Sequence, residues 1–173
     1  DAAALAIYSP AGVVVHTGDF KVDYTPVFGD AIDLQRFAEL GKKGVLALMC
    51  DSTNAERPGF TPSEKTVGKT FDSLFEEHKN TRIFVATFAS NVDRVQQIIN
   101  TAYKFGKKVC VEGRSMVSII ETARNLECIS IPDNTLIEID QLKNYPDDQQ
   151  VIITTGSQGE SMAALSRMAN GMH

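Results

Sequence analysis

A pattern of apolar run, polar turn and amphipathic helix occurs three times in this chain, and it constrains the fold more than any other feature. The turns are rich in Ser, Gly and Asn, and they comprise Phe88-Ala89-Ser90-Asn91, Glu112-Gly113-Arg114-Ser115 and Thr155-Gly156-Ser157-Gln158-Gly159-Glu160. Alternating strands and helices predict a parallel sheet, because parallel strands need a crossover connection that is usually a helix. The predicted fold class is therefore α/β, built on a parallel sheet.

The same pattern predicts where a ligand would bind. We expect strands of this sheet at 45–50, 82–87, 107–111 and 151–154, with 45–50 buried and 107–111 central. Ligands of such sheets bind beyond the carboxyl ends of the strands, which is where the three turns must lie. Each turn leads into a helix whose first backbone N–H groups can bind a phosphate. The sequence thus predicts a polyanion surface along one edge of the sheet.

The composition is typical of a globular protein, with 43% hydrophobic and 23% charged residues among 173. No apolar run approaches the roughly 20 residues of a membrane span, and no signal peptide opens the chain, so we expect a cytoplasmic protein without a membrane partner. The three cysteines have no C-x-x-C spacing. Cys50 and Cys110 lie in apolar runs, which predicts buried free thiols.

The charge distribution is more informative than the net charge of −5. Residues 81–130 hold seven Lys or Arg against four acidic residues, whereas the connector 131–150 holds one Lys against five acidic residues. The basic excess coincides with two of the three turns. A basic face on an acidic protein is typical of directed binding to RNA or phosphate. Solvated charge on a helix face is the favoured explanation for any single residue, but the clustering of the charges with the turns weakens it.

The first part of the chain has a different organisation. Residues 2–8 and 13–17 flank a Ser9-Pro10-Ala11-Gly12 turn, which predicts a β-hairpin. Apolar spacing within 30–40 predicts a short helix. Asp19 follows the second hairpin strand directly, and Asp51 follows the apolar run 45–50.

Several segments, taken in order, resemble the ribonuclease J family, which are nucleases of the metallo-β-lactamase fold and the β-CASP group. The segments that carry the resemblance are His16-Thr17-Gly18-Asp19-Phe20-Lys21, Asp51-Ser52-Thr53-Asn54, Ala86-Thr87-Phe88-Ala89-Ser90-Asn91, Gly113-Arg114-Ser115-Met116, Thr155-Gly156-Ser157-Gln158-Gly159-Glu160 and Met162-Ala163-Ala164-Leu165-Ser166-Arg167-Met168-Ala169. Each segment alone is weak evidence, but the ordered set is specific and covers nearly the whole chain.

The resemblance implies two domains. Residues 1–50 would be part of a metallo-β-lactamase domain, with its hairpin and helix, and 51–173 would be a β-CASP domain, a three-layer α/β unit around a parallel sheet. Family members hydrolyse RNA with two zinc ions, by endonucleolytic cleavage and by 5′-to-3′ exonuclease action. The implied partners are RNA and further subunits, in a homo-oligomer or a hetero-oligomer with a paralogue.

The chain also departs from the family. The histidine-rich zinc motifs have no counterpart here, so we expect a fragment that lacks nuclease activity by itself and binds zinc weakly. Asp19 is the one metal ligand that remains. Asp93 stands where family members often carry histidine, which puts a phosphate or base contact at that position in doubt.

The resemblance gives two acidic residues catalytic roles. Asp19, at a strand end, would bridge two cations that activate a water on a phosphodiester. Asp51 would orient metal-bound water or a zinc-ligating histidine. From spacing alone, a turn or cap role is favoured for Asp19, and the resemblance reverses that preference; for Asp51 the two roles are balanced.

The polar residues of the turns are candidates for RNA-backbone contacts. Hydroxyl and N–H groups suit phosphate oxygens, and arginine offers a forked donor. The candidates are Ser90, Asn91, Arg94, Arg114, Ser115, Ser157, Gln158 and Gly159. A helix N-cap is the simpler role for any single Ser or Asn, and we expect Ser115 to cap its helix. Gly113, Gly156 and Gly159 are expected to allow positive φ or a close backbone approach.

Two other functions remain open on the sequence. One is a non-enzymatic α/β module that binds a nucleotide or small phosphate through the same turns without metal. The other is an inactive paralogue that serves as a scaffold for protein contacts.

Overall fold

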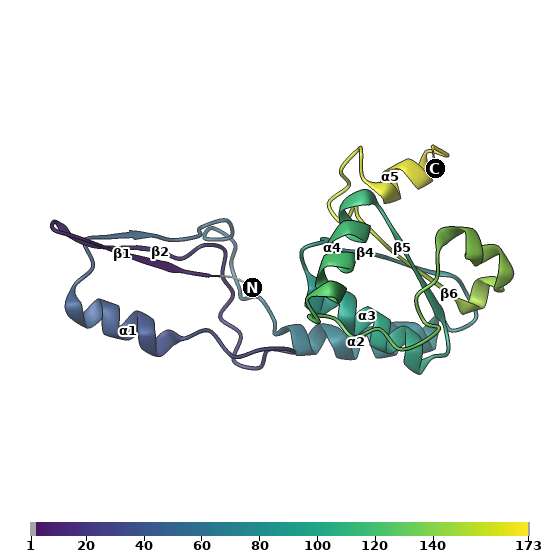
Figure 1. Ribbon diagram of the computed structural model, residues 1–173, viewed down its shortest axis with the longest axis horizontal. Helices are drawn as coiled ribbons and strands as arrows, with labels where there is room; N and C mark the ends of the chain where they lie inside the picture. Colours follow the sequence, from purple (N-terminus) through teal and green to yellow (C-terminus); the bar gives the residue numbers. More distant parts are fainter. Residues whose placement is uncertain (1–2, 173) are drawn as a thin grey trace. The chain divides into compact units, whose positions relative to one another are not determined.

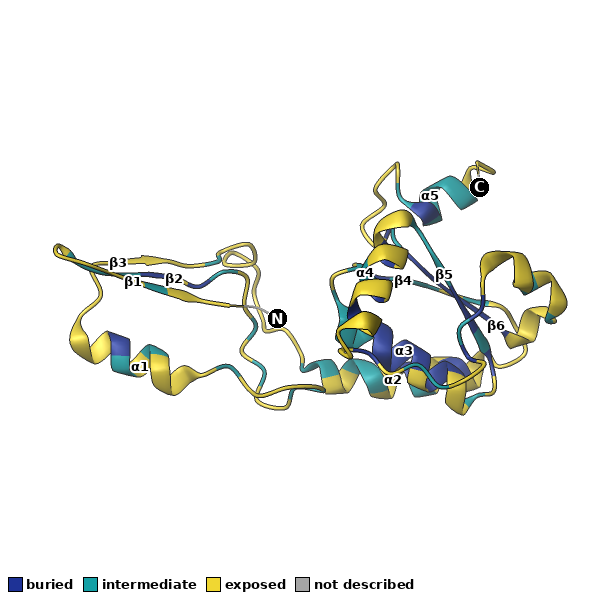
Figure 2. Cartoon of the chain, viewed as in Figure 1, coloured by how far each residue is buried: buried dark blue, intermediate teal, exposed yellow. Residues whose placement is uncertain are grey.

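The computed structural model describes residues 3–172, and its contacts divide the chain into two compact units, Asp1–Lys65 and Thr66–His173. Figures 1 and 2 show the elements of each unit and how far their residues are buried. The domain boundary expected after residue 50 stays a prediction. Within residues 3–172, no helix combines the length and the apolar character that crossing a membrane requires.

The first unit is built on a three-stranded sheet. Strands β1 (Leu5–Ser9) and β2 (Gly12–His16) form the expected antiparallel hairpin, and β3 (Ala47–Met49) pairs with β2 in parallel. Helix α1 (Leu34–Lys43) provides the crossover between β2 and β3. The assignment of 45–50 to the sheet of the later strands is therefore wrong, because its backbone hydrogen-bonds to β2 instead.

The side chains of β3 and its flanks are exposed, contrary to the prediction of a buried strand. Leu48 is 61% exposed and Met49 is 55% exposed, and Cys50 is exposed as well. β3 is the edge strand of a small sheet, and α1 buries only part of the apolar surface there (Figure 2). Val15 on β2 and Leu40 on α1 are the buried hydrophobic residues that the described part of this unit contains.

The second unit contains the predicted parallel sheet. Its strand order is β4 (Ile83–Ala86), β6 (Gln150–Thr154), β5 (Lys108–Glu112), and both pairs are parallel. The central strand is β6 rather than β5, so the expectation of a central 107–111 strand is wrong. Every residue of β6 is buried, as its two neighbours require.

Both faces of this sheet are covered, which confirms the layered α/β arrangement. One face packs against α2 (Glu64–Glu77), α3 (Val92–Lys104) and α4 (Arg114–Asn125), and its core contains Val109, Val151 and Ile153. The other face presents Cys110 and Ile152. These contact a 3₁₀ segment, η1 (Ile139–Asn144), and the short helix α5 (Ala164–Ala169). Side chains alternate between faces because a strand has a two-residue period.

A buried lysine, Lys107, hydrogen-bonds to the acidic connector 131–150 just before β6 begins. Lys107 is 3% exposed, and its ammonium donates to the carbonyl oxygens of Lys79 at 2.8 Å, Thr81 at 3.3 Å and Asp148. The connector contains η1 and a second 3₁₀ turn, η2 (Asp147–Gln149), before β6 begins. Three carbonyl partners compensate for the loss of water around the buried charge.

Candidate functional site

The three polar turns lie at one edge of the sheet of the second unit. Ala86 pairs with Thr154 and Thr154 pairs with Glu112, so β4, β6 and β5 end at the same level. The pairing continues one residue further, where the N–H of Thr87 donates to the carbonyl of Thr154 at 3.0 Å. Because all three strands are parallel, the turns that follow them share this carboxyl edge, as predicted (Figure 1).

The first turn is organised by a helix cap. Asn91 is the N-cap of α3, and its side-chain oxygen accepts a hydrogen bond from the N–H of Arg94 at 3.0 Å. Ser90 is exposed beside it, and Arg94 lies partly buried in the first turn of the helix. The capping role therefore occupies the oxygen of Asn91, and its amide N–H groups remain as donors to a ligand.

The second turn differs from the prediction that Ser115 caps the helix. α4 begins at Arg114, its N-cap is Gly113, and Ser115 lies within the first helical turn. Gly113 has a φ of +104°, and a Cβ there would lie 3.0 Å from the Thr155 hydroxyl oxygen. A close approach of the second and third turns thus requires glycine at this position, and the first N–H groups of α4 have no side-chain cap.

The third turn is longer than expected. α5 begins only at Ala164, and Met162 before it is 82% exposed, so the turn extends beyond Glu160. Ser157, Gln158 and Gly159 are all exposed, and the N–H of Gln158 donates to the Glu160 carboxylate at 3.1 Å. The positive φ predicted for the glycines is present, at +114° for Gly156 and +75° for Gly159.

A cavity of about 650 Å³ joins the second and third turns. Its basic and hydroxyl groups come from Arg114, Ser115, Ser118, Thr155 and Arg167, and its acidic groups come from Glu112, Glu121 and Glu160. Sequence reasoning missed Ser118 and Arg167. Ser118 lies one helical turn beyond Arg114, so i, i+4 spacing could have identified it. Arg167 reaches the cavity through tertiary packing of α5, which no local pattern reveals.

The two arginines of this cavity differ in how free their guanidinium groups are to bind a ligand. The side chain of Arg167 donates to the carbonyl of Met172 at 3.4 Å. Arg114 is exposed, and within residues 3–172 its guanidinium forms no ion pair. Its forked donor can meet an anion at the N-terminus of α4.

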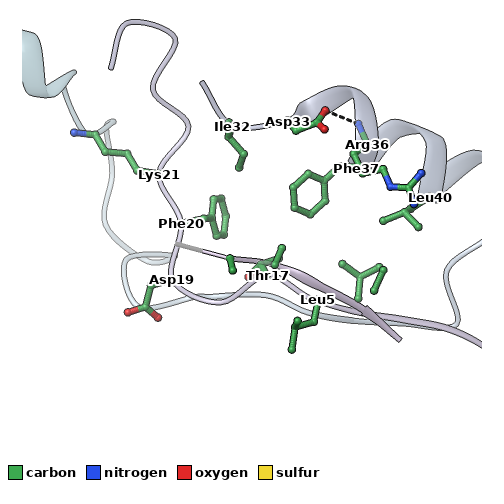
Figure 3. A pocket seen from close by; sticks show the side chains of 14 residues that line it. Leu5, Thr17, Asp19, Phe20, Lys21, Ile32, Asp33, Arg36, Phe37 and Leu40 are labelled. Carbon is green, nitrogen blue, oxygen red and sulfur yellow. Dashed lines mark hydrogen bonds between the residues drawn. The ribbon is translucent and has the colours of Figure 1, made fainter. Parts of the chain in front are cut away.

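In the first unit, the two aspartates follow neighbouring parallel strands. Asp19 comes after β2 and Asp51 after β3, and Thr17 ties the two strand ends together. The N–H of Thr17 donates to the Met49 carbonyl at 3.0 Å, and the N–H of Asp51 donates to the Thr17 hydroxyl at 3.1 Å. Asp19 is exposed. It belongs to the lining of an apolar cavity of about 370 Å³ between the sheet and α1, but its carboxylate points away from the other labelled side chains (Figure 3).

The carboxylate of Asp51 is held by its own loop. The hydroxyl and then the backbone N–H of Thr53 donate to it, the latter at 3.0 Å, and these bonds lower the pKa of Asp51 below its ordinary value. The acid is therefore ionised and fixed in orientation at neutral pH. This geometry suits a group that accepts a hydrogen bond or faces a cation.

The residues that the structure describes do not form a complete donor set for a metal. Across residues 3–172, no group of three or more His, Cys, Asp or Glu side chains is placed to hold a metal ion. His16 is the histidine nearest to Asp19 in sequence, and its Nδ1 accepts a hydrogen bond from the N–H of Gly18 at 3.0 Å. A pair of zinc ions needs several nitrogen and oxygen ligands, so the described residues do not fit such a centre by themselves.

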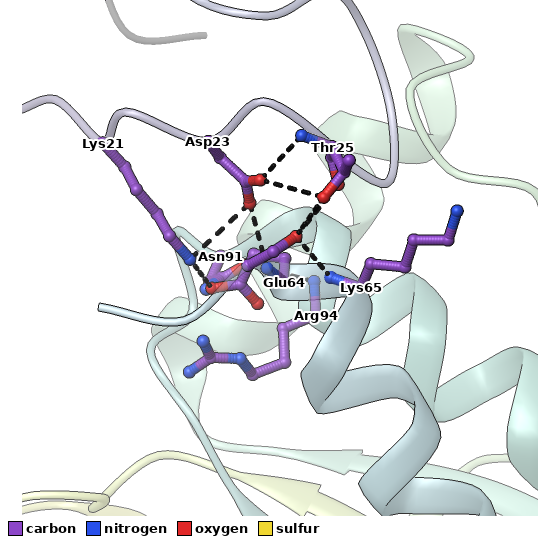
Figure 4. A network of polar contacts seen from close by, with 8 residues as sticks. Lys21, Asp23, Thr25, Glu64, Lys65, Asn91 and Arg94 are labelled. Atoms are coloured by element: carbon purple, nitrogen blue, oxygen red, sulfur yellow. Dashed lines mark hydrogen bonds and ion pairs between the residues drawn. The ribbon is translucent and has the colours of Figure 1, made fainter. Parts of the chain in front are cut away.

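A polar network fixes the segment between Asp19 and Asp51 to the start of α2 (Figure 4). Asp23 accepts from the N–H of Glu64 at 3.0 Å and from the N–H of Thr25 at 3.0 Å. The ammonium of Lys21 lies 3.1 Å from Glu64 and 3.8 Å from Asp23. The hydroxyl of Ser63 donates to the Thr25 carbonyl at 3.0 Å. Sequence reasoning did not predict this network, because the contacts from the 21–25 segment to Ser63 and Glu64 join positions about 40 residues apart.

Comparison with known proteins shows what the chain resembles. Residues 80–173 match the family model "Ribonuclease J, beta-CASP domain". The whole chain is 51% identical to Ribonuclease J of Synechocystis and 50% identical to that of Mycobacterium tuberculosis H37Rv. It covers 27% and 31% of those two proteins, so it spans less than a third of the length of these curated relatives.

A solved structure shares the fold at low sequence identity. A protein of unknown function from Enterococcus faecalis V583 aligns with a TM-score of 0.58 and 18% identity, over 91% of this chain and 39% of that one. At this identity the likeness concerns the fold alone.

Proposed function

Because this chain belongs to the ribonuclease J family, we propose that it supplies RNA-backbone contacts and part of the active site of an RNA-hydrolysing enzyme. The observation that carries the proposal is the shared carboxyl edge of β4, β6 and β5, where the three polar turns lie. Two helices begin there: α3, which Asn91 caps, and α4, which has no side-chain cap. The parent activity proposed is hydrolysis of RNA phosphodiesters, both within the strand and from its 5′ end.

The chemistry of the edge supports a phosphate backbone as ligand. The Arg114 guanidinium, the Ser115 hydroxyl and the first N–H groups of α4 line or adjoin one cavity, and all of them donate hydrogen bonds. On the next turn, Ser157 exposes its hydroxyl and Gln158 its side-chain amide, whereas the N–H groups of Gln158 and Gly159 donate within the turn, to the Glu160 carboxylate and the Gly156 carbonyl. Such donors fix the position of a nucleic acid without reading its sequence.

In the first unit, we propose that Asp19 contributes one carboxylate to a metal centre and that Asp51 orients its surroundings. Asp19 is exposed at a strand end, and a carboxylate there is a suitable ligand for zinc. The two zinc ions, when bound, would supply a hydroxide that attacks the phosphodiester. This chain would contribute two aspartates to that centre, one to hold the metal and one to position the groups around it. We also propose a cytoplasmic location and association into homo- or hetero-oligomers.

The test is RNA affinity of the Arg114→Ala variant. Loss of a charged hydrogen bond to phosphate is worth about 1.5–3 kcal/mol, which corresponds to roughly 10- to 150-fold weaker binding. Lysine at this position should recover only part of the affinity, because an ammonium cannot reproduce the fork. Binding is measured by fluorescence anisotropy with a labelled single-stranded RNA, at two salt concentrations.

Arg124→Ala is the matched control, since Arg124 is an exposed arginine in the last turn of the same helix. Its affinity should stay within about twofold of the unmodified chain, a difference below 0.5 kcal/mol by the roughly 1.4 kcal/mol that a tenfold change represents. A lowered melting temperature with unchanged affinity in Arg114→Ala would assign Arg114 a structural role. Stronger binding of free nucleotide than of RNA would favour the small-phosphate module instead.

A further inference from the structure

One aromatic ring of the first unit is left almost fully exposed to solvent. Phe60 is 91% exposed, more than any other large hydrophobic residue that the structure describes. Burying a phenylalanine side chain stabilises a protein, so a ring left in water forgoes this stabilisation. A single exposed ring is common, however, and only its surroundings can give it a function.

The loop that carries Phe60 is fixed at both ends. At its start, the N–H of Asp51 donates to the Thr17 hydroxyl at 3.1 Å. At its end, Ser63 binds the Thr25 carbonyl and the N–H of Glu64 binds Asp23, each at 3.0 Å (Figure 4). Between these points, the N–H groups of Ala55 and Arg57 close two successive turns at 3.0 Å. An exposed ring on an anchored loop binds a ligand at low entropic cost.

A cavity of about 330 Å³ adjoins the ring. Its lining includes Lys21, Val22, Asp51, Asn54, Phe60 and Thr61. Its volume lies at the lower end of the range for small-molecule sites, about 300–1,000 Å³. Aromatic and aliphatic surface thus stands beside amide and hydroxyl groups within one pocket.

The charges of this cavity favour the base of a nucleotide over its phosphate. The Asp51 carboxylate, which the hydroxyl and N–H of Thr53 hold in place, carries a negative charge that would repel a phosphate. Lys21 is neutralised by Glu64 at 3.1 Å and Asp23 at 3.8 Å. A flat ring with polar edges meets these conditions, because its face can stack on Phe60 while the Asn54 amide and Thr61 hydroxyl can hydrogen-bond its edge.

We propose that Phe60 is a stacking platform for one base of single-stranded RNA, seated in the cavity of the 51–61 loop. This rests on the proposed function, in that the chain must bind RNA. It adds a base contact to the backbone contacts proposed for the second unit. Because every base has an aromatic face, the platform accepts all four bases.

The first test uses a single tryptophan as reporter. The chain contains no Trp, so Phe60→Trp creates a unique fluorophore at the platform. Titration with a single-stranded RNA octamer should quench its emission. Tyr103→Trp is the matched control, because Tyr103 is 58% exposed near the C-terminal end of α3, and its emission should not change.

The second test separates base from backbone. Phe60→Ala should weaken binding of the octamer by about 5- to 150-fold. Its affinity for an abasic octamer, which has the same phosphates and no bases, should be unchanged, and Phe60→Tyr should retain full affinity for both.

Equal affinity of Phe60→Ala and the unmodified chain for the octamer would overturn the platform and leave the proposed function standing. Unquenched emission from the Phe60→Trp variant in a bound complex would do the same. If the unmodified chain bound neither octamer, the proposed function itself would fail and the platform with it.

Discussion

At the scale of single residues, burial decides the chemistry of the three thiols. Cys110 lies on β5 at 1% exposure, and burial, followed by the charges of Glu112 and Glu138, raises its pKa to about 12. Cys50 and Cys128 are exposed. The apolar run around Cys50 predicted a buried thiol, but an uncovered edge strand precedes it.

We therefore expect two of the three thiols to react with a maleimide at about pH 7.5 in the native chain. Cys110 should react only after denaturation, because the thiolate is the reactive species and is not accessible there. Mass spectrometry after timed labelling measures the number of modified sites. The Cys110→Ala variant serves as control and should show the same two fast sites, whereas rapid modification of Cys110 would contradict its placement in the core.

At the scale of elements, the network around Asp23 links the start of α2 to the 21–25 segment and should make the first unit acid-sensitive. Partial desolvation acts to raise the pKa of Asp23. The N–H groups of Glu64 and Thr25, the Ser63 hydroxyl and the Lys21 charge act against it, and the net result is a pKa below the ordinary value of 3.8.

The sign of the pH effect follows from this lowering. A carboxyl group with a lowered pKa in the folded state stabilises the protein above pH 3.8, and that stability is lost as the pH falls through the lower, folded value. We expect Asp23→Asn to lose less stability than the unmodified chain between about pH 5 and pH 2, measured by urea unfolding. Asp30→Asn, at an exposed loop position of the same unit, should behave like the unmodified chain. Identical pH dependence in all three proteins would contradict the network.

At the scale of the whole molecule, the apolar cores are unequally distributed. Both hydrophobic clusters of the described chain belong to the second unit, where Val109, Val151 and Ile153 are fully buried. In the first unit, the described residues bury Val15 and Leu40. Stability within a protein follows such differences, because local opening exposes little apolar surface where little is buried.

We expect hydrogen exchange to separate the two units. Amides of β5 and β6 should exchange at least about 100-fold more slowly than those of β1 and β3, which lie at the edges of the small sheet. Mass spectrometry of peptic fragments measures this directly. Amides of β2, paired on both sides, give an internal reference of intermediate protection. Equal protection of β1 and β6 would show that the first unit is stabilised by more than its visible core.

Much of the second unit followed from the sequence. Its strands were predicted to within a residue or two, because apolar runs that end in Gly- and Ser-rich turns have few other structures. The shared edge of the turns followed as well, since parallel strands leave no alternative. The glycines at 113, 156 and 159 were identified for the same reason, as their positive φ is a local property. The family could be identified from ordered short motifs alone.

Only the tertiary structure decided which strands pair and which residues meet. An apolar run such as 45–50 carries no information about its partner, and hydrogen bonds to β2 placed it in a separate sheet. Likewise, the central strand is β6 rather than β5. Arg167 lines the same cavity as Arg114, and Phe60 is exposed at a cavity that Asp51 and Asn54 also line. Local propensity fixes the elements, whereas pairing and burial depend on contacts between residues far apart in the chain, and these are set by the packing of the whole unit.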